Sequence, residues 1–292
     1  MTVASSSAQS WALFKEQVDD TIIKALQPKI IYPILAKVYP AISPSVEYNV
    51  TESWLDAEEV SESGEYKSKV MNFQRRFATI KDVGIAPRIP INWIKDARWD
   101  LVNDHVEAIG FGIARKINSD FLTALNLFVA GGQVDGQTYA GVPDNVKPAT
   151  ALWSASGADI LADISAGLAQ LGAQNAGEGK KYLIVHPYQM QHIRLDPNLV
   201  KYLNYGDPAL IQRGIYPTPF GVDILETTQA ATTYALMVNV DLAALKYYER
   251  EPLTTEMEKS ARSKNLDIVA YIRYAFACGR PKAVVKINGT LA

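Results

Sequence analysis

The most regular pattern of apolar positions in this chain lies between residues 92 and 128. Apolar side chains recur there at steps of mostly four, with charged residues between them, which is the period of an amphipathic helix. At about 1.5 Å per residue this helix would be roughly 55 Å long, well above the usual length. We expect a bend or a close contact at Gly110 and Gly112. The pattern thus predicts one long central helix, with a stripe formed by Ile94, Val102, Val106, Ile109, Ile113, Ile117, Phe121, Leu125 and Phe128.

Within the first 46 residues, a helical pattern is followed by an apolar string that prolines interrupt. Residues 10–26 favour a short amphipathic helix, because Trp11, Phe14, Val18, Ile22 and Leu26 are three or four positions apart. Prolines then interrupt an apolar string, and at this density they exclude a continuous helix and a central strand. We expect an arm that has no core of its own and lies on the body of the protein or on another subunit. The interrupting residues are Pro28, Pro33, Pro40 and Pro44.

Residues 45–51 and 67–80 alternate as strands do, and they flank a polar, acidic middle. The returning limb is basic. This pattern predicts a long two-stranded hairpin with a charged tip, which alone is only marginally stable in water. An ordinary edge hairpin on the chain's own sheet stays open as the alternative.

The second half of the chain predicts a mixed α/β block and then a strand-rich return. A turn-rich stretch, residues 131–148, precedes this block. Ser156, with Asp159 three residues on, is the expected N-cap of an Ala-rich helix that ends near Gly172. A second short helix is expected over residues 187–195. Strands are expected at residues 182–185, 222–226, 234–240, 245–250, 266–276 and 283–287.

Composition narrows the function classes. The chain is 48% hydrophobic, and its 29 basic and 31 acidic residues give a formal charge of -2. This balance points to no charged partner or membrane surface. Cys278 is the only cysteine, which excludes an intrachain disulfide and favours a reducing folding compartment. We expect no signal peptide at the start of the chain, and no run reaches the roughly 18 to 20 apolar residues of a membrane span.

The sequence does not match the catalytic and metal-binding motifs that we searched for. The nearest approach to a phosphate loop is Gly179-Lys180, but Gln174 stands where the first glycine is needed and Lys181 where the hydroxyl is needed. His186 and His192 are six residues apart, which does not suit two metal ligands on one helix face. His186-Pro187 is instead typical of a helix entry, and Cys278 of a small core side chain. We therefore expect no catalytic, cofactor or metal site.

Three local stretches and the order of segments resemble a known family. Tyr182-Leu-Ile-Val-His-Pro-Tyr-Gln-Met is similar to a strand that enters a helix through a proline. Phe220-Gly-Val-Asp-Ile-Leu-Glu-Thr-Thr is similar to the strand that follows it. In Asn265-Leu-Asp-Ile-Val-Ala-Tyr-Ile-Arg-Tyr-Ala-Phe-Ala, an arginine alternates with apolar residues as in the family's closing strand. Together with the arm, charged hairpin and long helix, these stretches resemble the tailed-phage major capsid protein of the Hong Kong 97 type.

This resemblance implies an α+β fold. It implies an N-terminal arm (1–46), an extended loop (47–88), a peripheral domain with the long spine helix (89–150 and 239–292) and an axial domain (151–238). It further implies a non-enzymatic subunit that assembles with itself into the pentamers and hexamers of an icosahedral shell. The shell would enclose viral double-stranded DNA in the virion, after assembly in the host cytoplasm. Portal and scaffold proteins are the other implied partners, and no membrane is implied.

The subunit interface is expected on the arm and the hairpin, since neither segment has a core of its own and each gains burial by lying across neighbours. An encapsulin-like nanocompartment shell, which encloses protein cargo, is one alternative. A mixed α/β enzyme is another, and the particle size of the purified protein separates it from either shell. The predicted interface residues are Ile31, Tyr32, Leu35, Tyr39, Glu52, Trp54, Asp56, Glu58, Glu59, Lys67, Lys69, Arg75 and Arg76.

Overall fold

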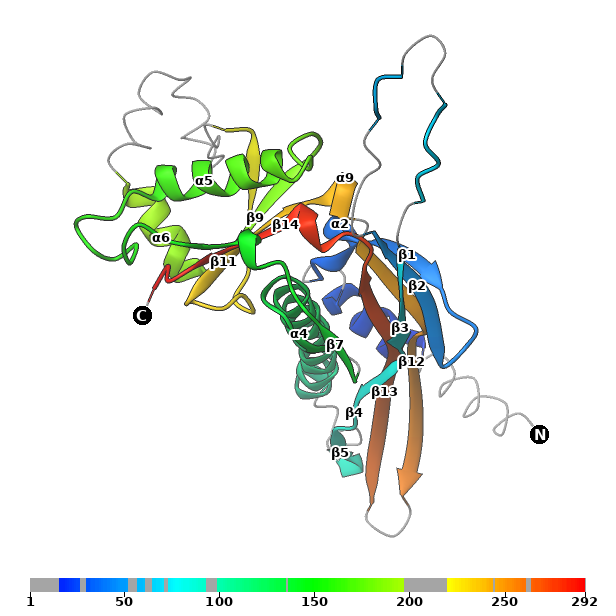
Figure 1. Ribbon diagram of the computed structural model, residues 1–292. Helices are drawn as coiled ribbons and strands as arrows, with labels where there is room; N and C mark the ends of the chain where they lie inside the picture. The colour runs from blue at the N-terminus through cyan, green and yellow to red at the C-terminus, as the bar shows by residue number, and fades with distance from the viewer. Residues whose placement is uncertain are drawn as a thin grey trace.

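Two β-sheets lie on either side of one long helix, and two described stretches of the loop between β2 (Ser45–Thr51) and β3 (Phe73–Thr79) stand away from them (Figure 1). The elements that the sequence predicts occur in the expected order, the structure adds short strands between them, and the fold is mixed helix and strand. Side chains at 99–102 and 259–260 are not described. The computed structural model describes residues 16–26, 30–51, 57–60, 65–70, 73–92, 99–134, 136–196, 220–243, 245–260 and 264–291.

The long helix α4 (Trp99–Ala130) confirms the predicted central element. Its apolar stripe is buried from Val106 to Phe128, because the helix lies between strands of both sheets. The predicted beginning of the helix, including Ile94, falls outside the described residues. Gly110 is a point of close contact, as expected: a Cβ there would lie 2.8 Å from the carbonyl oxygen of Ile22. Ile22 belongs to a helix at residues 16–26, which confirms the second half of the predicted N-terminal helix.

The first sheet, here the peripheral sheet, has the order β1-β12-β13-β4, and β5 pairs with β13 as well. In β13 the residues from Leu266 to Tyr274 alternate between buried and half-buried, so the predicted alternation is confirmed. Ala41 donates its N–H to the Glu249 carbonyl at 2.8 Å, so its neighbour Pro40 faces the open edge, where no N–H is needed. The strands are β1 (Lys37–Pro40), β4 (Lys81–Ile85), β5 (Arg88–Pro90), β12 (Leu245–Ser260) and β13 (Asn265–Cys278).

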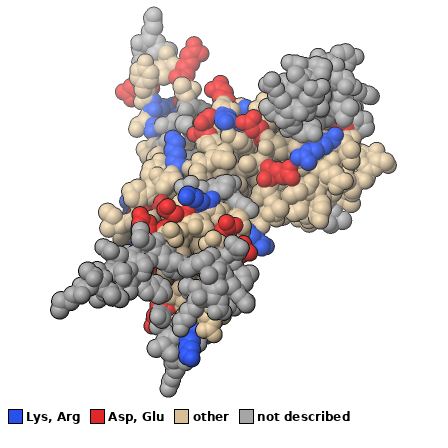
Figure 2. Space-filling model, turned by 180° about the vertical axis from the view of Figure 1, so that it is seen from behind, with Lys and Arg blue, Asp and Glu red and all other residues tan. Residues whose placement is uncertain are grey.

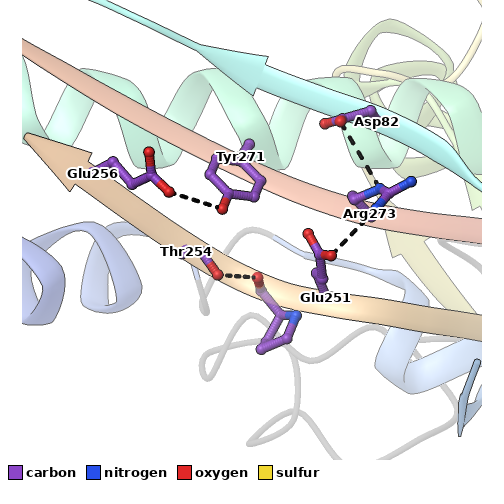
Figure 3. A network of polar contacts seen from close by, with 7 residues as sticks. Asp82, Glu251, Thr254, Glu256, Tyr271 and Arg273 are labelled. Carbon is purple, nitrogen blue, oxygen red and sulfur yellow. Dashed lines mark hydrogen bonds and ion pairs between the residues drawn. The ribbon is translucent and has the colours of Figure 1, made fainter. Parts of the chain in front are cut away.

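Strand β12 is irregular near Pro252, where its register with β13 shifts twice. Polar contacts tie this part of the sheet together (Figure 3). Arg273 of β13 reaches Glu251 of β12 at 3.2 Å and Asp82 of β4 at 3.9 Å. The Tyr271 hydroxyl donates to Glu256 at 3.2 Å. These contacts join three strands across a stretch where the backbone ladder is interrupted.

The second sheet, here the axial sheet, has the order β10-β9-β11-β14-β8. Helix α5 (Ile160–Ala173) packs against it, and Gly167 allows α5 to approach Met237 closely. Helix α6 (Pro187–Leu195) has the predicted bounds. A one-turn helix α9 (Val240–Ala243) and short 3-10 turns, η2 (Pro143–Asn145) and η3 (Pro281–Ala283), complete this part. The strands are β8 (Val146–Pro148), β9 (Lys181–Val185), β10 (Val222–Glu226), β11 (Tyr234–Asn239) and β14 (Val284–Asn288).

Buried polar side chains hold the loops of the axial sheet. Asp163 accepts from the Thr150 backbone N–H and from the Trp153 indole, both at 2.8 Å. Gln189 donates to the Thr232 and Tyr234 carbonyls and accepts from the His186 N–H. Because each of these polar groups has partners, their burial costs little.

Three sequence-based expectations differ from this structure. The N-cap of α5 is Asp159, whose carboxylate accepts from the Ala162 N–H at 3.0 Å, whereas Ser156 lies in the preceding turn. Strands β4 and β5 pair with β13, so residues 81–90 belong to the peripheral sheet and only the part before them can be an extended loop. Strand β14 pairs with β11, which assigns residues 284–288 to the axial sheet, contrary to the predicted division. The alternating pattern located β14 but held no information about its partner, and β4 and β5 were not predicted as strands.

Candidate assembly interface

The predicted hairpin is present as β2 (Ser45–Thr51) and β3 (Phe73–Thr79), which pair antiparallel. Its inner face rests on the chain itself, where it forms a small second core against β12 and β13. Successive side chains of a strand point to opposite faces, so this packing leaves the other face of the hairpin outward. The residues of the second core are Ala41, Tyr48, Val50, Ala78, Tyr248, Ala275 and Ala277.

The outer face of the hairpin combines apolar and charged side chains. Phe73 and Phe77 are 53% and 46% exposed. Between them, Arg75 pairs with Glu47 of the facing strand at 3.0 Å. Both partners of this ion pair are largely exposed, so it adds little stability and mainly fixes the register of the two strands.

Two described stretches of the loop, residues 57–60 and 65–70, stand away from the body of the molecule (Figure 1). Tyr66 and Val70 are 88% and 81% exposed. Glu58 joins the two stretches, because its carboxylate pairs with Lys69 at 2.8 Å and with Lys67 at 3.6 Å. Glu59 is exposed beside it. The predicted interface residues Glu52, Trp54 and Asp56 lie outside the described residues.

A short ribbon after α4 clamps the root of the hairpin. It consists of β6 (Gly132–Val134) and β7 (Gln137–Tyr139). The Gln137 side chain donates to the Phe77 carbonyl at 3.1 Å and accepts from the Phe77 N–H at 3.3 Å, as a neighbouring strand would. Arg76 donates to the Thr138 carbonyl at 2.9 Å and lies over the Tyr139 ring, whose hydroxyl bonds that of Tyr48. The direction of the hairpin is thus tied to the end of the long helix.

Sequence reasoning missed this clamp, because residues 131–148 were interpreted only as a turn-rich break. A signal was present. The dipeptide Asp135-Gly136 is typical of a two-residue hairpin turn, and it separates the two strands of the ribbon.

Gln137→Ala is expected to loosen the root of the hairpin without unfolding the subunit. The variant loses two hydrogen bonds, each contributing about 1 kcal/mol. Amide exchange at Phe77 should therefore become on the order of tenfold faster. Gln133→Ala, at an exposed site on β6, is the matched control. Unchanged exchange at Phe77 would contradict the clamp.

The arm is attached to its own chain. Tyr32 stacks on Tyr247 at a centroid distance of 3.9 Å, and the Ile31 N–H donates to Asn118 of α4 at 3.1 Å. Ile31, Tyr32 and Leu35 are buried in the core of the chain, so in this arrangement they offer little surface to a neighbour. Tyr39 differs, since it stays 38% exposed on β1 beside Tyr248. Tyr32 and Leu35 lie at the two ends of α2 (Tyr32–Leu35), a helix of a single turn that precedes β1.

Three of the groups considered for chemistry, His186, Lys180 and Cys278, have structural roles. The His186 ring accepts from the Tyr188 N–H at the start of α6, which confirms the expected helix entry. The Lys180 N–H is bound by the Asp241 carboxylate at 2.7 Å, so an anion occupies the place where a phosphate would bind. Cys278 is fully buried, and burial raises the pKa of its thiol to about 12. The described residues include no cluster of side chains suited to a metal ion.

The surface charge is mixed. On the face shown in Figure 2, acidic and basic side chains of the described residues are interspersed instead of gathering into one patch of a single sign. Among the helices that the structure describes, none is long and apolar enough to cross a membrane. The candidate site is therefore the exposed hairpin with its clamp, which is suited to protein contacts.

Solved structures with the same arrangement are capsids and similar particles. The capsid of the cyanophage P-SCSP1u is similar with a TM-score of 0.67 and 13% identity, over 90% of this chain and 89% of that chain. A structure of Mycobacterium phage Che8 has a TM-score of 0.64 and 17% identity, over 90% and 92% of the two chains. A virus-like particle from Pyrococcus furiosus has a TM-score of 0.58 and 14% identity, over 94% and 98%. At these identities the likeness establishes the fold, which is the Hong Kong 97-type α+β fold.

The family model of the phage capsid protein matches residues 88–287, which is more than half of the chain. The chain belongs to the phage capsid protein family. It is a major capsid protein, a structural subunit of an icosahedral shell. No curated protein matches the sequence. The nanocompartment and enzyme alternatives gain no support from these comparisons.

Proposed function

We propose that the extended loop before β4 is the main assembly device of this capsid subunit, and that the shell it builds encloses double-stranded DNA. Pentamers and hexamers form when copies of the loop lie across neighbouring subunits. The interface includes Tyr39 and, on the hairpin and its loop, Glu52, Trp54, Asp56, Glu58, Glu59, Lys67, Lys69, Arg75 and Arg76. Portal and scaffold proteins are the proposed further partners, in the host cytoplasm during assembly. The subunit has no catalytic activity of its own in this proposal.

The observation that carries this proposal is the exposed apolar surface of the hairpin. Tyr66 and Val70 on the loop are 88% and 81% exposed, and Phe73 and Phe77 on the outer face of β3 are 53% and 46% exposed. A soluble monomer rarely leaves large apolar side chains grouped in this way. Covering them on a neighbour contributes about 25 cal/mol per Å² of apolar surface. Many copies of a modest contact then make a closed shell cooperative.

The charges of the loop suit the selection of a partner. Its acidic residues lie on one limb and the tip, and Lys67 and Lys69 lie on the returning limb. Exposed charges contribute little to affinity, but they steer the encounter and set the register. A loop docked in the wrong register would place like charges opposite each other.

Replacement of residues 52–66 by a short Gly/Ser linker is expected to abolish shell formation and to leave the subunit folded. The described residues of this stretch, 57–60 and 65–66, are not part of the buried core, so the melting temperature is expected to change by only a few degrees. Electron microscopy and sedimentation would measure the shells, and circular dichroism the fold. Normal shells from this variant would contradict the role of the loop.

A linker inserted elsewhere provides the control. Residues 154–157 lie in an exposed turn of the axial part, and the same linker placed there keeps the loop intact. If both variants fail to form shells, the loop has no special role. Failure of the loop variant alone supports the proposal.

A further inference from the structure

A pocket of about 290 Å³ lies at the root of the hairpin, between β2, β3, the end of β7 and η3. Val50, Phe128 and Tyr139 form apolar parts of its wall. Sites for whole small molecules measure roughly 300–1,000 Å³, so this pocket is suited to one large side chain.

The two charged residues that line the pocket, Arg76 and Lys282, are both cations. Arg76 is held in place by the Thr138 carbonyl and the Gln74 side chain. The ammonium group of Lys282 forms no ion pair with any residue that the structure describes. An apolar wall with cations beside it favours an aromatic side chain that has a carboxylate next to it.

The chain itself contains such a group. Residues 52–66 include six acidic residues and no basic one, and they end in Glu65-Tyr66. Tyr66 is the most exposed aromatic side chain of the described residues, at 88%. Figure 1 shows residues 65–70 standing away from the body, whereas the pocket lies at the root of the same hairpin. Tyr66 therefore does not fill the pocket of its own chain, and a second copy of the chain offers the same side chain from outside.

We propose that this pocket receives Tyr66 of a second copy of the chain, and that Glu65 of that copy pairs with Lys282. The contact buries an aromatic side chain that is otherwise in water, and it pairs a cation on the pocket with an anion on the tip. The root that holds the hairpin of one subunit then receives the loop tip of the next subunit. The direction of each loop is therefore linked to its docking, from subunit to subunit around a ring. This proposal rests on the proposed self-assembly and specifies where the loop binds.

A charge exchange tests the ionic part of this contact. Lys282→Glu and Glu65→Lys, made singly, place like charges opposite each other and should each reduce the yield of shells by about tenfold or more. The double variant Lys282→Glu/Glu65→Lys restores the opposite pair and should recover most of the yield. Lys24→Glu, at an exposed site on the helix at residues 16–26, applies the same change of charge far from the pocket and should leave the yield unchanged.

A disulfide tests the geometry. Subunits with Tyr66→Cys are mixed with subunits that have Thr51→Cys on the pocket wall, and the mixture is assembled and oxidised. A covalent dimer on a non-reducing gel is expected in mixed shells, and it cannot arise within one chain. Cys278 is fully buried and stays out of the reaction. Mixed shells that assemble normally without this dimer would overturn the docking of Tyr66.

The outcomes separate the two proposals. If the wild-type chain forms no shells, the proposed function fails, and the pocket contact fails with it. If wild-type shells form and Lys282→Glu assembles equally well, the pocket contact is overturned while the proposed function stands. Restored assembly in the charge-exchanged double variant, with the dimer in mixed shells, supports the contact.

Discussion

The Ile113→Asp variant is expected to give insoluble or misfolded protein. Ile113 lies at the centre of the α4 stripe and is 2% exposed. The helix packs there between strands of both sheets, so the new carboxylate has no route to water. Burial of an unpaired carboxylate costs several kcal/mol, and the lost isoleucine removes roughly 1.5–3 kcal/mol more. A domain of this kind has only about 5–15 kcal/mol of stability in total.

Arg115→Asp is the matched control for this variant, because it introduces the same residue two positions away on the exposed face of α4. It should change the free energy of unfolding by less than about 1 kcal/mol. Soluble yield, circular dichroism and thermal melting measure both variants. If Ile113→Asp gives soluble subunits with an unchanged melting temperature, the helix is not buried between the sheets.

The sequence predicted the elements with strong periodicity. The apolar stripe of α4 and the alternation in β13 follow from the local pattern, because each element repeats it over many residues. The start of α6 follows from the helix entry at His186-Pro187. The hairpin was predicted for the same reason. Its outward direction could also be expected, since the residues between its strands are polar and acidic.

Pairing between distant segments could not be predicted. Strand β14 follows β13 along the chain by a few residues, yet it pairs with β11 in the other sheet. Both sheets offer an apolar partner, and a single strand has no pattern that selects one. The clamp was missed for a related reason. Gln137 acts through its side-chain amide on the backbone of Phe77, 60 residues away, and no local periodicity contains this contact.

The arm shows where reasoning from composition was incomplete. A proline-interrupted apolar string can be buried on its own chain or on a neighbour, and the sequence left both open. The structure places Tyr32 against Tyr247 and buries Leu35 completely, so much of the arm contributes to the fold of the subunit. Exposed apolar surface remains on both segments, since Ile42 of the arm is 95% exposed and Tyr66 of the hairpin loop 88%. The assembly proposals concern the hairpin most because its loop stands away from the body of the molecule.

Gly110→Ala is expected to lower the stability of the subunit, against the usual trend for a glycine within a helix. Alanine normally stabilises a helix interior by about 1 kcal/mol relative to glycine. At Gly110, however, a Cβ would lie 2.8 Å from the Ile22 carbonyl oxygen and 2.9 Å from the Ala25 Cβ. The helix at residues 16–26 has to move away, although Ile22 is completely buried there. Overpacking of this kind costs roughly 1–3 kcal/mol, so the net change should be a loss of stability.

Gly112→Ala is the paired test, and the opposite sign is expected. A Cβ at Gly112 would meet only the end of the Ile85 side chain, at an ordinary contact distance of 3.5 Å. This variant should therefore gain up to about 1 kcal/mol from helix propensity. Thermal melting measures the change in stability of both variants. Limited proteolysis should release the N-terminal segment faster in Gly110→Ala alone. Equal stabilisation by both substitutions would mean that the helix at residues 16–26 does not pack against Gly110, and the arm would then be free to lie on a neighbouring subunit.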